Sequence, residues 1–257
     1  MTKPLIMGVL NITPDSFSDG GLYNTPDLAL EQAAELVRDG ADILDVGGES
    51  TRPGAMRVPI AEEISRVVPV IERISKLGAA VSIDTMNAPT ARSAVAAGAT
   101  IINDVSGGLN DPEIFAVAAE ANATLIISHW RGHSDKMDEL TDYQDIAKDV
   151  ASELQKQVEL ARAAGVTKLV IDPGLGFAKN VDQNWELLEN LHELEALNLP
   201  ILIGASRKRF IAARLKGQDT VEARDAATAE LMQQLTQKHN LWGIRVHNVK
   251  AVSARQN

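Results

Sequence analysis

The 257-residue sequence contains no cysteine. Disulfide bonds and thiolate metal sites are therefore excluded as sources of stability or chemistry. Aromatic residues make up only 4% of the chain, which favours a helix-rich α/β protein over an all-β sandwich. No apolar run approaches the roughly 18 residues that a membrane-spanning helix needs, and no secretory leader precedes the first apolar segment. From these absences we expect a cytoplasmic protein.

The chain also lacks an excess of basic residues, and its formal net charge is −10. An acidic chain of this kind argues against a nucleic-acid-binding surface. The net charge does not exclude a small anionic substrate, because a pocket can be locally basic. The positions of the arginines therefore matter more than the total charge.

One pattern recurs along the sequence: an apolar stretch ends in a polar residue and then in a loop. Ile171-Asp172 precedes a loop rich in proline and glycine, and Ile83-Asp84 and Ile102-Asn103 repeat the pattern. Such segments are typical of buried parallel strands that carry one polar side chain at their carboxyl ends. Strands are predicted at residues 3–10, 41–46, 79–84, 100–104, 123–128, 168–172, 201–204 and 242–246. Helices are predicted at residues 27–39, 61–76, 88–97, 111–120, 141–164, 184–197, from about 210, and at 221–238.

Eight strands that alternate with helices predict an α/β protein with a single-domain (β/α)₈ TIM barrel fold over residues 1–257. About 250 residues suffice for this fold. The alternative is a doubly wound open sheet, which is disfavoured because no G-x-G-x-x-G motif follows the first strand. Only residues 248–257 follow the eighth strand, so the closing helix is predicted to be short at most.

In a TIM barrel the carboxyl ends of the strands and the following loops form the active site. Two chemical groups of residues are predicted there. Carboxylates and an amide suit the edge of a flat heterocycle, because a carboxylate accepts two parallel hydrogen bonds from an amino-pyrimidinone; these are Asp84, Asn103 and Asp172, with Lys208. Cations and hydroxyls suit a phosphate or diphosphate; these are Thr51, Arg52, Ser206, Arg245 and His247.

The loops after the first two strands are unusually long. Residues 11–21 and 47–55 are polar and glycine-rich, and they exceed the roughly 2–6 residues of a simple strand-to-helix connection. Each is either a plain surface connection or a mobile lid over the pocket.

These loops carry a family resemblance. Residues 7–21 read MGVLNITPDSFSDGG and residues 46–55 read VGGESTRPGA. They resemble the two signatures of the dihydropteroate synthase family. Shorter motifs continue in the family's order: SIDT at 82–85, NDVSG at 103–107, DPGLGF at 172–177, SRK at 206–208 and RVH at 245–247. The resemblance covers essentially the whole chain, and its first two motifs are long enough to be specific.

The resemblance implies a reaction and a set of ligands. The family condenses (7,8-dihydropterin-6-yl)methyl diphosphate with 4-aminobenzoate, which releases diphosphate and forms 7,8-dihydropteroate in folate synthesis. By resemblance, the pterin is held by Asp84, Asn103, Asp172 and Lys208, and a Mg²⁺ ion by Asn11. The diphosphate is held by Thr51, Arg52, Arg245 and His247. The 4-aminobenzoate site consists of Phe17, Pro53, Phe177 and Ser206, and sulfonamides would compete there.

The chemistry favours a dissociative mechanism without a strong general base. Diphosphate is a good leaving group once cations spread its charge, and the electron-rich pterin stabilises the carbon left behind. Catalytic roles are predicted for Arg52 and Lys208, and for Asp15 and Asp19, which offset the positive charge or help to order the metal. The resemblance also implies a homodimer.

Two positions depart from the usual family pattern. Asn248 stands where the last motif normally has an aspartate, which is expected to alter the support of His247. Ser128 stands where a methionine commonly precedes His129, which is expected to loosen an apolar wall of the pterin pocket. Asp45 and Asp104 are interpreted as local hydrogen-bond acceptors at strand ends. The histidines outside the motifs are interpreted as packing or surface residues.

Two other functions are compatible with a pterin pocket. A folate-dependent methyltransferase barrel would not need the cationic group. A silent pterin-binding paralogue would keep the carboxylates and lose residues of the loops or of the anion site. The presence of Asn11, Asp15, Asp19, Arg52 and Lys208 favours the synthase.

Overall fold

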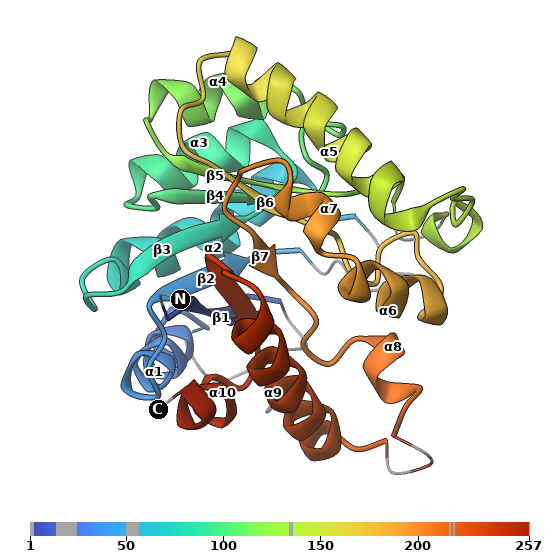
Figure 1. The fold of residues 1–257 in the computed structure, drawn as a ribbon. Helices are drawn as coiled ribbons and strands as arrows, with labels where there is room; N and C mark the ends of the chain where they lie inside the picture. The colour runs from blue at the N-terminus through green and yellow to red at the C-terminus, as the bar shows by residue number, and fades with distance from the viewer. Residues whose placement is uncertain are drawn as a thin grey trace.

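The computed structural model describes residues 3–13, 25–49, 57–133, 136–215, 217 and 219–256. Within these residues eight strands alternate with helices (Figure 1). The strands are β1 (Leu5–Asn11), β2 (Ile43–Gly47), β3 (Ala80–Asp84), β4 (Ile101–Asp104), β5 (Thr124–Ser128), β6 (Leu169–Asp172), β7 (Leu202–Ile203) and β8 (Gly243–Val246). The helices are α1 (Thr25–Arg38), α2 (Ile60–Ile74), α3 (Ala88–Ala96), α4 (Glu113–Glu120), α5 (Ile146–Ala163), α6 (Val181–Glu189), α7 (His192–Glu195), α8 (Arg209–Ala212), α9 (Val221–Lys238) and α10 (Val249–Gln256), with a short 3₁₀ helix at Met137–Glu139. All eight predicted strands are present.

The strands form one parallel sheet in the order β6-β5-β4-β3-β2-β1-β8-β7. Its two outer strands, β6 and β7, meet through an isolated parallel bridge between Ile171 and Ile201. There the Ile171 N–H donates to the Pro200 carbonyl at 2.9 Å. The bridge closes the sheet into a barrel, and the helices lie around its outside (Figure 1). The predicted TIM barrel is confirmed.

The barrel has two apolar cores. The larger one lies between the strands and the surrounding helices and includes Leu44, Val46 and Ile71. The smaller one contains one buried residue from each of six strands: Met7, Ile43, Ile101, Ile126, Val170 and Leu202. One residue per strand is typical of a side-chain layer inside a barrel. Because side chains alternate between the two faces of a strand, residues two positions further along these strands face the interior nearer the carboxyl ends.

Two predicted helices differ from the observed ones. The helix expected at 141–164 begins only at Ile146, because the side chain of Asp145 caps it by accepting from the Lys148 N–H at 3.2 Å. The helix expected at 184–197 is two helices, α6 and α7. Helix α6 begins earlier than predicted, with a capping box between Asn180 and Gln183, and ends where the Asn190 side chain donates to the Glu186 carbonyl at 2.9 Å. The closing helix, α10, is short as expected.

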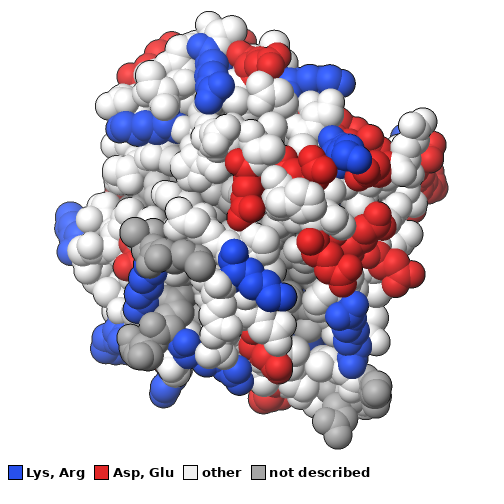
Figure 2. Space-filling view, viewed as in Figure 1, with Lys and Arg blue, Asp and Glu red and all other residues white. Residues whose placement is uncertain are grey.

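Among the described helices, none has the length and apolar character that crossing a membrane requires. Figure 2 shows acidic side chains gathered over α6 and α7, the charged segment 182–195. The charged side chains of this segment are exposed or half-buried, whereas its leucines are buried.

Candidate functional site

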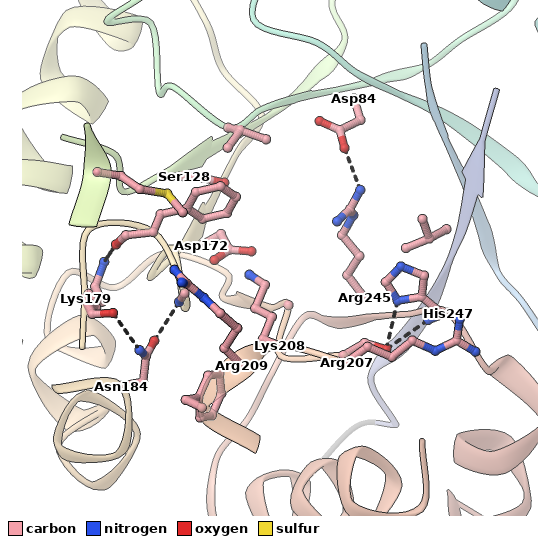
Figure 3. Close-up of a pocket in the computed structure, with 18 of the residues that line it drawn as sticks. Asp84, Ser128, Asp172, Lys179, Asn184, Arg207, Lys208, Arg209, Arg245 and His247 are labelled. Carbon is pink, nitrogen blue, oxygen red and sulfur yellow. Dashed lines mark hydrogen bonds and ion pairs between the residues drawn. The ribbon is translucent and has the colours of Figure 1, made fainter. Parts of the chain in front are cut away.

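The carboxyl ends of the strands open into a cavity of about 1050 Å³ (Figure 3). Its wall brings together residues from β1, β3, β4, β5, β6 and β8 and from the segments that follow β7 and β8. These include Asn11, predicted for Mg²⁺, and every described residue predicted for the pterin and the diphosphate: Asp84, Asn103, Asp172, Lys208, Arg245 and His247. The two predicted groups therefore share one cavity.

Alternation along the strands explains why polar residues lie above the small core. Asp45, Asn103 and Asp172 each stand two residues after a member of that core, namely Ile43, Ile101 and Val170. They therefore face the same interior, at its open end. All three are buried. The barrel interior is therefore apolar at the small core and polar toward the carboxyl ends of the strands.

Arg245 lies in the middle of this polar layer. Its Nε donates to Asp45 Oδ2 at 2.6 Å, and its Nη2 donates to Asp84 Oδ2 at 2.6 Å. Asn103 Nδ2 donates to the same oxygen of Asp45 at 3.2 Å. One guanidinium thus serves two buried carboxylates that come from different strands.

Two carboxylates around one cation leave the layer rich in acceptors. Burial raises the pKa of Asp84 to about 7; Arg245 opposes this rise and Asp45 adds to it. For Arg245, the two carboxylates outweigh the opposing effect of burial, so its pKa is raised and it stays charged. The other oxygen of Asp45 is buried and has no hydrogen-bond partner among the described residues. The layer therefore suits a ligand that brings several N–H donors.

The interpretation of Asp45 as a local acceptor is wrong. Its partner, Arg245, is 200 positions away in the sequence. The same interpretation is confirmed for Asp104, whose oxygens accept from the Ser106 and Gly108 N–H groups at 2.8 and 2.6 Å. Alternation separates the two cases, because Asp45 follows an interior residue by two positions, whereas Asp104 directly follows the interior residue Asn103 and faces outward.

Asp172 is joined to the loop that follows β6. Its Oδ1 accepts from the Gly174 N–H at 2.7 Å. Burial raises its pKa, and the nearby Lys208 opposes that rise. Lys208 Nζ donates to the Leu175 carbonyl and lies 4.8 Å from the centre of the Phe177 ring. Burial lowers the pKa of Lys208 to about 8, with Asp172 opposing. The structure thus places a predicted pterin residue, Lys208, against a predicted aminobenzoate residue, Phe177.

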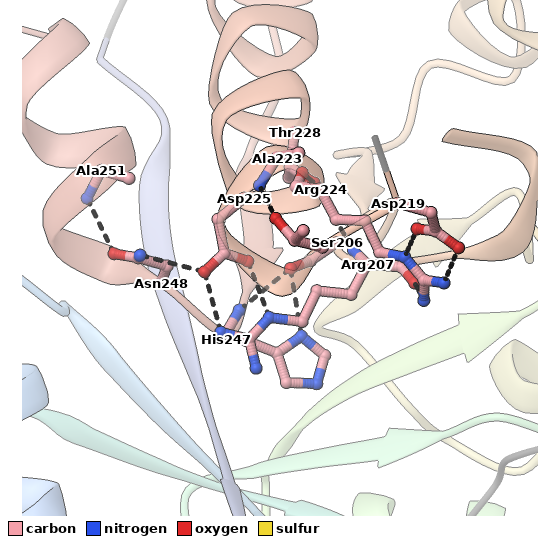
Figure 4. Close-up of polar contacts among 11 residues, drawn as sticks. Ser206, Arg207, Asp219, Ala223, Arg224, Asp225, Thr228, His247, Asn248 and Ala251 are labelled. Carbon is pink, nitrogen blue, oxygen red and sulfur yellow. Dashed lines mark hydrogen bonds and ion pairs between the residues drawn. The ribbon is translucent and has the colours of Figure 1, made fainter. Parts of the chain in front are cut away.

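Ser206 and His247 are in direct contact beyond the ends of β7 and β8 (Figure 4). Ser206 Oγ lies 3.0 Å from His247 Nδ1 and accepts from the His247 backbone N–H at 3.1 Å. Ser206 was predicted for 4-aminobenzoate and His247 for the diphosphate. Their contact brings these two parts of the cavity together.

Arg207 turns away from this pair. Its backbone has a φ of 60°, and its side chain forms a two-pronged ion pair with Asp225 at 2.7 and 2.8 Å (Figure 4). Asn248 Nδ2 donates to the same carboxylate at 3.0 Å, and its Oδ1 accepts from the Ala251 N–H at 3.0 Å. The amide at position 248 therefore supports Asp225 and the start of α10. An aspartate there would face the Asp225 carboxylate as a like charge.

Asn11 ends β1, beside the glycine that ends β2. A Cβ atom on Gly47 would lie 3.6 Å from Asn11 Oδ1 and 3.7 Å from Asp84 Oδ2, so the glycine leaves open space between the two side chains. The described residues contain no group of three acidic or histidine side chains that would hold a metal by themselves. A single amide oxygen still fits Mg²⁺, which commonly takes few protein ligands together with substrate phosphate oxygens and water.

Six predicted site residues lie outside the described residues: Asp15, Phe17, Asp19, Thr51, Arg52 and Pro53. Their roles remain predictions. Ser128, the departure before His129, is buried and lines the cavity. Its effect on the pterin pocket also remains a prediction.

The sequence did not reveal Lys179 and Asn184 as residues of this site. Lys179 is 6% exposed and Asn184 is 2% exposed, and both line the cavity behind the loop that follows β6. Asn184 Oδ1 accepts from the Gly176 N–H at 2.6 Å. A lysine directly before a helix cap usually points into solvent, so no local signal distinguished Lys179. Its distance of a few residues from DPGLGF was the only indication.

Comparison with known proteins places the whole chain in one group. Residues 7–247 match the family described as pterin binding enzyme. The dihydropteroate synthase of Mycobacterium leprae is 48% identical over 253 residues, which cover 96% of this chain and 89% of the relative. The dihydropteroate synthase of Bacillus subtilis is 43% identical over 254 residues, which cover 98% of this chain and 86% of the relative.

Solved structures agree with the sequence relatives. The dihydropteroate synthase of Xanthomonas albilineans with 4-aminobenzoic acid superposes with a TM-score of 0.91 and 39% identity, over 99% of this chain and 91% of that chain. The same organism's enzyme in complex with 7,8-dihydropteroate gives a TM-score of 0.88 and 36% identity, over 100% and 93%.

Proposed function

This chain belongs to the dihydropteroate synthase family of pterin-binding enzymes, which are transferases of folate synthesis, and we propose that it joins (7,8-dihydropterin-6-yl)methyl diphosphate to 4-aminobenzoate. The products are 7,8-dihydropteroate and diphosphate. The observation that carries the proposal is the buried polar layer of Asp84, Asn103 and Asp172 at the mouth of the barrel, with Lys208 beside it.

The polar layer binds the pterin in this proposal. The amino-pyrimidinone edge offers N–H donors to Asp172 and to the acceptors around Asp84, which Arg245 alone does not satisfy. Lys208 supplies a donor to a ring acceptor. The ligand-bound relatives support this assignment, since a related structure contains 7,8-dihydropteroate.

The diphosphate lies at the cationic side of the same cavity. Arg245 belongs to β8 and His247 follows it. The proposal adds Thr51 and Arg52, which lie outside the described residues. These groups spread the negative charge of the leaving diphosphate. Asn11 would hold a Mg²⁺ ion, which would supply further neutralisation of the diphosphate charge.

The bond between carbon and the diphosphate oxygen breaks before the new C–N bond forms. The pterin ring delocalises the positive charge that develops on the methylene carbon, and Asp15 and Asp19 offset it. The amine of 4-aminobenzoate attacks this carbon and then loses a proton, so it needs placement more than activation. Phe177 and Ser206, with Phe17 and Pro53, form the wall that places it. Sulfonamides compete for the same position, and the active protein is a homodimer.

Release of diphosphate tests the proposal. Both substrates and Mg²⁺ are mixed with the protein, and the release of diphosphate and of dihydropteroate is measured. The two products are expected to form in equal amounts. Arg52→Ala is expected to lower kcat/KM, because a cation at the diphosphate is lost; Arg38→Ala, an exposed change on α1, is the control. Pterin binding without diphosphate release would identify a silent pterin-binding protein. Methyl transfer from a folate to a corrinoid would identify a methyltransferase.

A further inference from the structure

Next to the cavity, a second group of polar side chains lies near the ends of β5 and β6, and one of its members, Lys179, lines the cavity. Lys179 and His129 are its buried members, with 6% and 2% exposure. Glu153, from α5, and Arg131 complete the group. None of these residues belongs to the polar layer that binds the pterin in the proposed function.

The ammonium group of Lys179 has three acceptors. Its Nζ lies 2.8 Å from His129 Nδ1, 3.1 Å from the Gly174 carbonyl oxygen and 3.1 Å from the Phe177 carbonyl oxygen. Burial lowers the pKa of Lys179 well below its usual range, and Asp172 opposes this shift. In the protonated form the group has three N–H bonds, so each proton has one partner. None of the three partners is a carboxylate. Lys179 therefore does not form an ion pair through these contacts.

The state of His129 follows from its other nitrogen. Nε2 lies 2.9 Å from Glu153 Oε2, and a carboxylate can only accept, so the ring proton is on Nε2. Nδ1 is then the acceptor that faces Lys179. Burial and the charge of Lys179 lower the pKa of His129 to about 4, which keeps the ring neutral. Glu153 is held in turn by Arg131, whose guanidinium lies 3.7 Å from the centre of the Tyr143 ring.

The two carbonyls that Lys179 binds are the ends of one turn. The Phe177 N–H donates to the Gly174 carbonyl at 3.1 Å, which closes the turn from Gly174 to Phe177. At its first end, the Gly174 N–H is bound to Asp172. At its other end is the Phe177 ring, and between them the Leu175 carbonyl receives Lys208. The turn thus carries contacts to both predicted substrate positions.

A second tether holds the same segment from outside. Tyr143 Oη donates to the Ala178 carbonyl at 3.0 Å, and the ring of Tyr143 packs against Arg131. Asn184 binds the Gly176 N–H and the Lys179 carbonyl. Backbone groups of the loop are therefore fixed by side chains at the inner end of the cavity, and Asp172 and Phe177 line the same cavity.

We propose that Lys179, held by neutral His129, is a positioning residue that locks the Gly174–Phe177 turn and so sets the place of 4-aminobenzoate relative to the bound pterin. This inference rests on the proposed function. Lys179 does not touch the reacting atoms; it acts through the Phe177 carbonyl and through the turn that Asp172 and Lys208 share.

Lys179→Met tests the inference, since methionine keeps the length and loses the three donors. We expect the KM for 4-aminobenzoate to rise about tenfold, with kcat changed less than about threefold, because placement is lost and the leaving-group chemistry is untouched. Lys156→Met, an exposed change on α5, is the matched control and is expected to leave both constants unchanged. Amide hydrogen exchange of residues 174–178, measured without substrates, is expected to accelerate in Lys179→Met alone.

A pair of changes at His129 separates positioning from general stability. His129→Asn places an amide oxygen near the position of Nδ1 and keeps the acceptor for Lys179. His129→Gln keeps a donor near Nε2 for Glu153 and loses that acceptor. We expect the KM for 4-aminobenzoate to rise with glutamine and to stay near the wild-type value with asparagine, even if both variants have the same melting temperature.

Two results would overturn the inference. One is a lower melting temperature in Lys179→Met with unchanged KM and unchanged exchange of the turn. The other, decisive if Lys179→Met does not fold, is equal KM values for the two His129 variants. A wild-type protein that releases no diphosphate would instead contradict the proposed function, and the exchange measurement would still report whether Lys179 locks the turn.

Discussion

Asp172 and Asp104 are both buried aspartates at strand ends, yet their side chains leave the strands on opposite faces. Both carboxylate oxygens of Asp104 accept hydrogen bonds from nearby backbone N–H groups. Asp172 gives one oxygen to the Gly174 N–H and faces the cavity. Asp172→Asn is expected to weaken dihydropterin binding about thirtyfold, which corresponds to about 2 kcal/mol, because an amide offers one acceptor and adds unwanted donors. Isothermal titration calorimetry with a dihydropterin measures this change.

Asp104→Asn is the matched control for that prediction. The chemical change is the same, and the lost hydrogen bonds are local to the β4 loop. The folded variant is expected to be less stable and to bind the dihydropterin within about threefold of the wild type. Equal losses of affinity in both variants would mean that Asp172 acts through the fold and not through the ligand.

Asp84 predicts a pH dependence. Its pKa is raised in the folded protein to about 7, so its contribution to folding stability is fully present below its unfolded value and is lost as the pH rises through about 7. Ligand N–H donors favour the charged carboxylate. Dihydropterin binding is therefore expected to release protons below pH 7, and affinity is expected to rise between about pH 5.5 and 7.5.

Calorimetry in two buffers of different ionisation enthalpy counts the protons released. Asp84→Asn is expected to reduce the number, and the remainder is expected to come from Asp172, whose pKa burial also raises. A wild-type affinity that is flat over this pH range would contradict the assignment of Asp84 to the pterin.

Sequence patterns located the residues with local signals and missed those with distant partners. Asp84 and Asp172 end predicted strands, Asn103 stands one residue before the end of another, and all three lie where the pattern placed them. Asp45 has the same local pattern, but its partner Arg245 becomes visible only when the first and last strands are side by side. Lys179 has no local signal at all, because its three acceptors are defined by the path of the loop.

At the scale of elements, strands were predicted more accurately than helices. The strand limits differ from the prediction by at most two residues, because each strand is an apolar run between polar turns. The start of α5 and the break between α6 and α7 depend on single side-chain caps, at Asp145 and Asn190. A cap competes with continuation of the helix, and periodicity alone does not decide which one prevails.

The β6 loop gives a prediction at this scale. Gly174 has a φ of 64°, and a Cβ atom there would lie 2.0 Å from the His129 carbonyl oxygen. Gly174→Ala is expected to destabilise the protein by about 3 kcal/mol or more, because the new Cβ atom would clash with a backbone carbonyl that cannot move aside. Gly78 has a φ of 92° with nothing within 4 Å of its Cβ position, so Gly78→Ala isolates the backbone strain, about 1 kcal/mol. Chemical denaturation compares the two, and equal losses would contradict the close contact with His129.

At the scale of the whole molecule, the barrel is least continuous between β6 and β7. Strand β7 has two residues, and it meets β6 through one bridge. Asp172 ends one of these strands and Lys208 follows the other. A pterin bound to both Asp172 and Lys208 would link β6 and β7 from the cavity side and so stabilise their junction, which is called the seam below.

Hydrogen exchange tests this mechanical role of the ligand. Without ligand, the amide of Ile171 is expected to exchange faster than amides in β2. With a dihydropterin at about 100 times its Kd, protection at the seam is expected to rise by up to about 100-fold. Equal protection of β2 and the seam by the ligand would show that no local closure occurs.

The strand order also determines when the barrel can close during synthesis on the ribosome. The first six strands can pair as neighbours as they emerge, but β8 must return to β1, and β7 must reach β6. Until residue 246 has emerged, a nascent six-stranded sheet has two bare edges, which invite pairing with other chains. Asp45 and Asp84 emerge long before Arg245, their shared cation. The chain is therefore expected to need a chaperone most just before its last strand emerges.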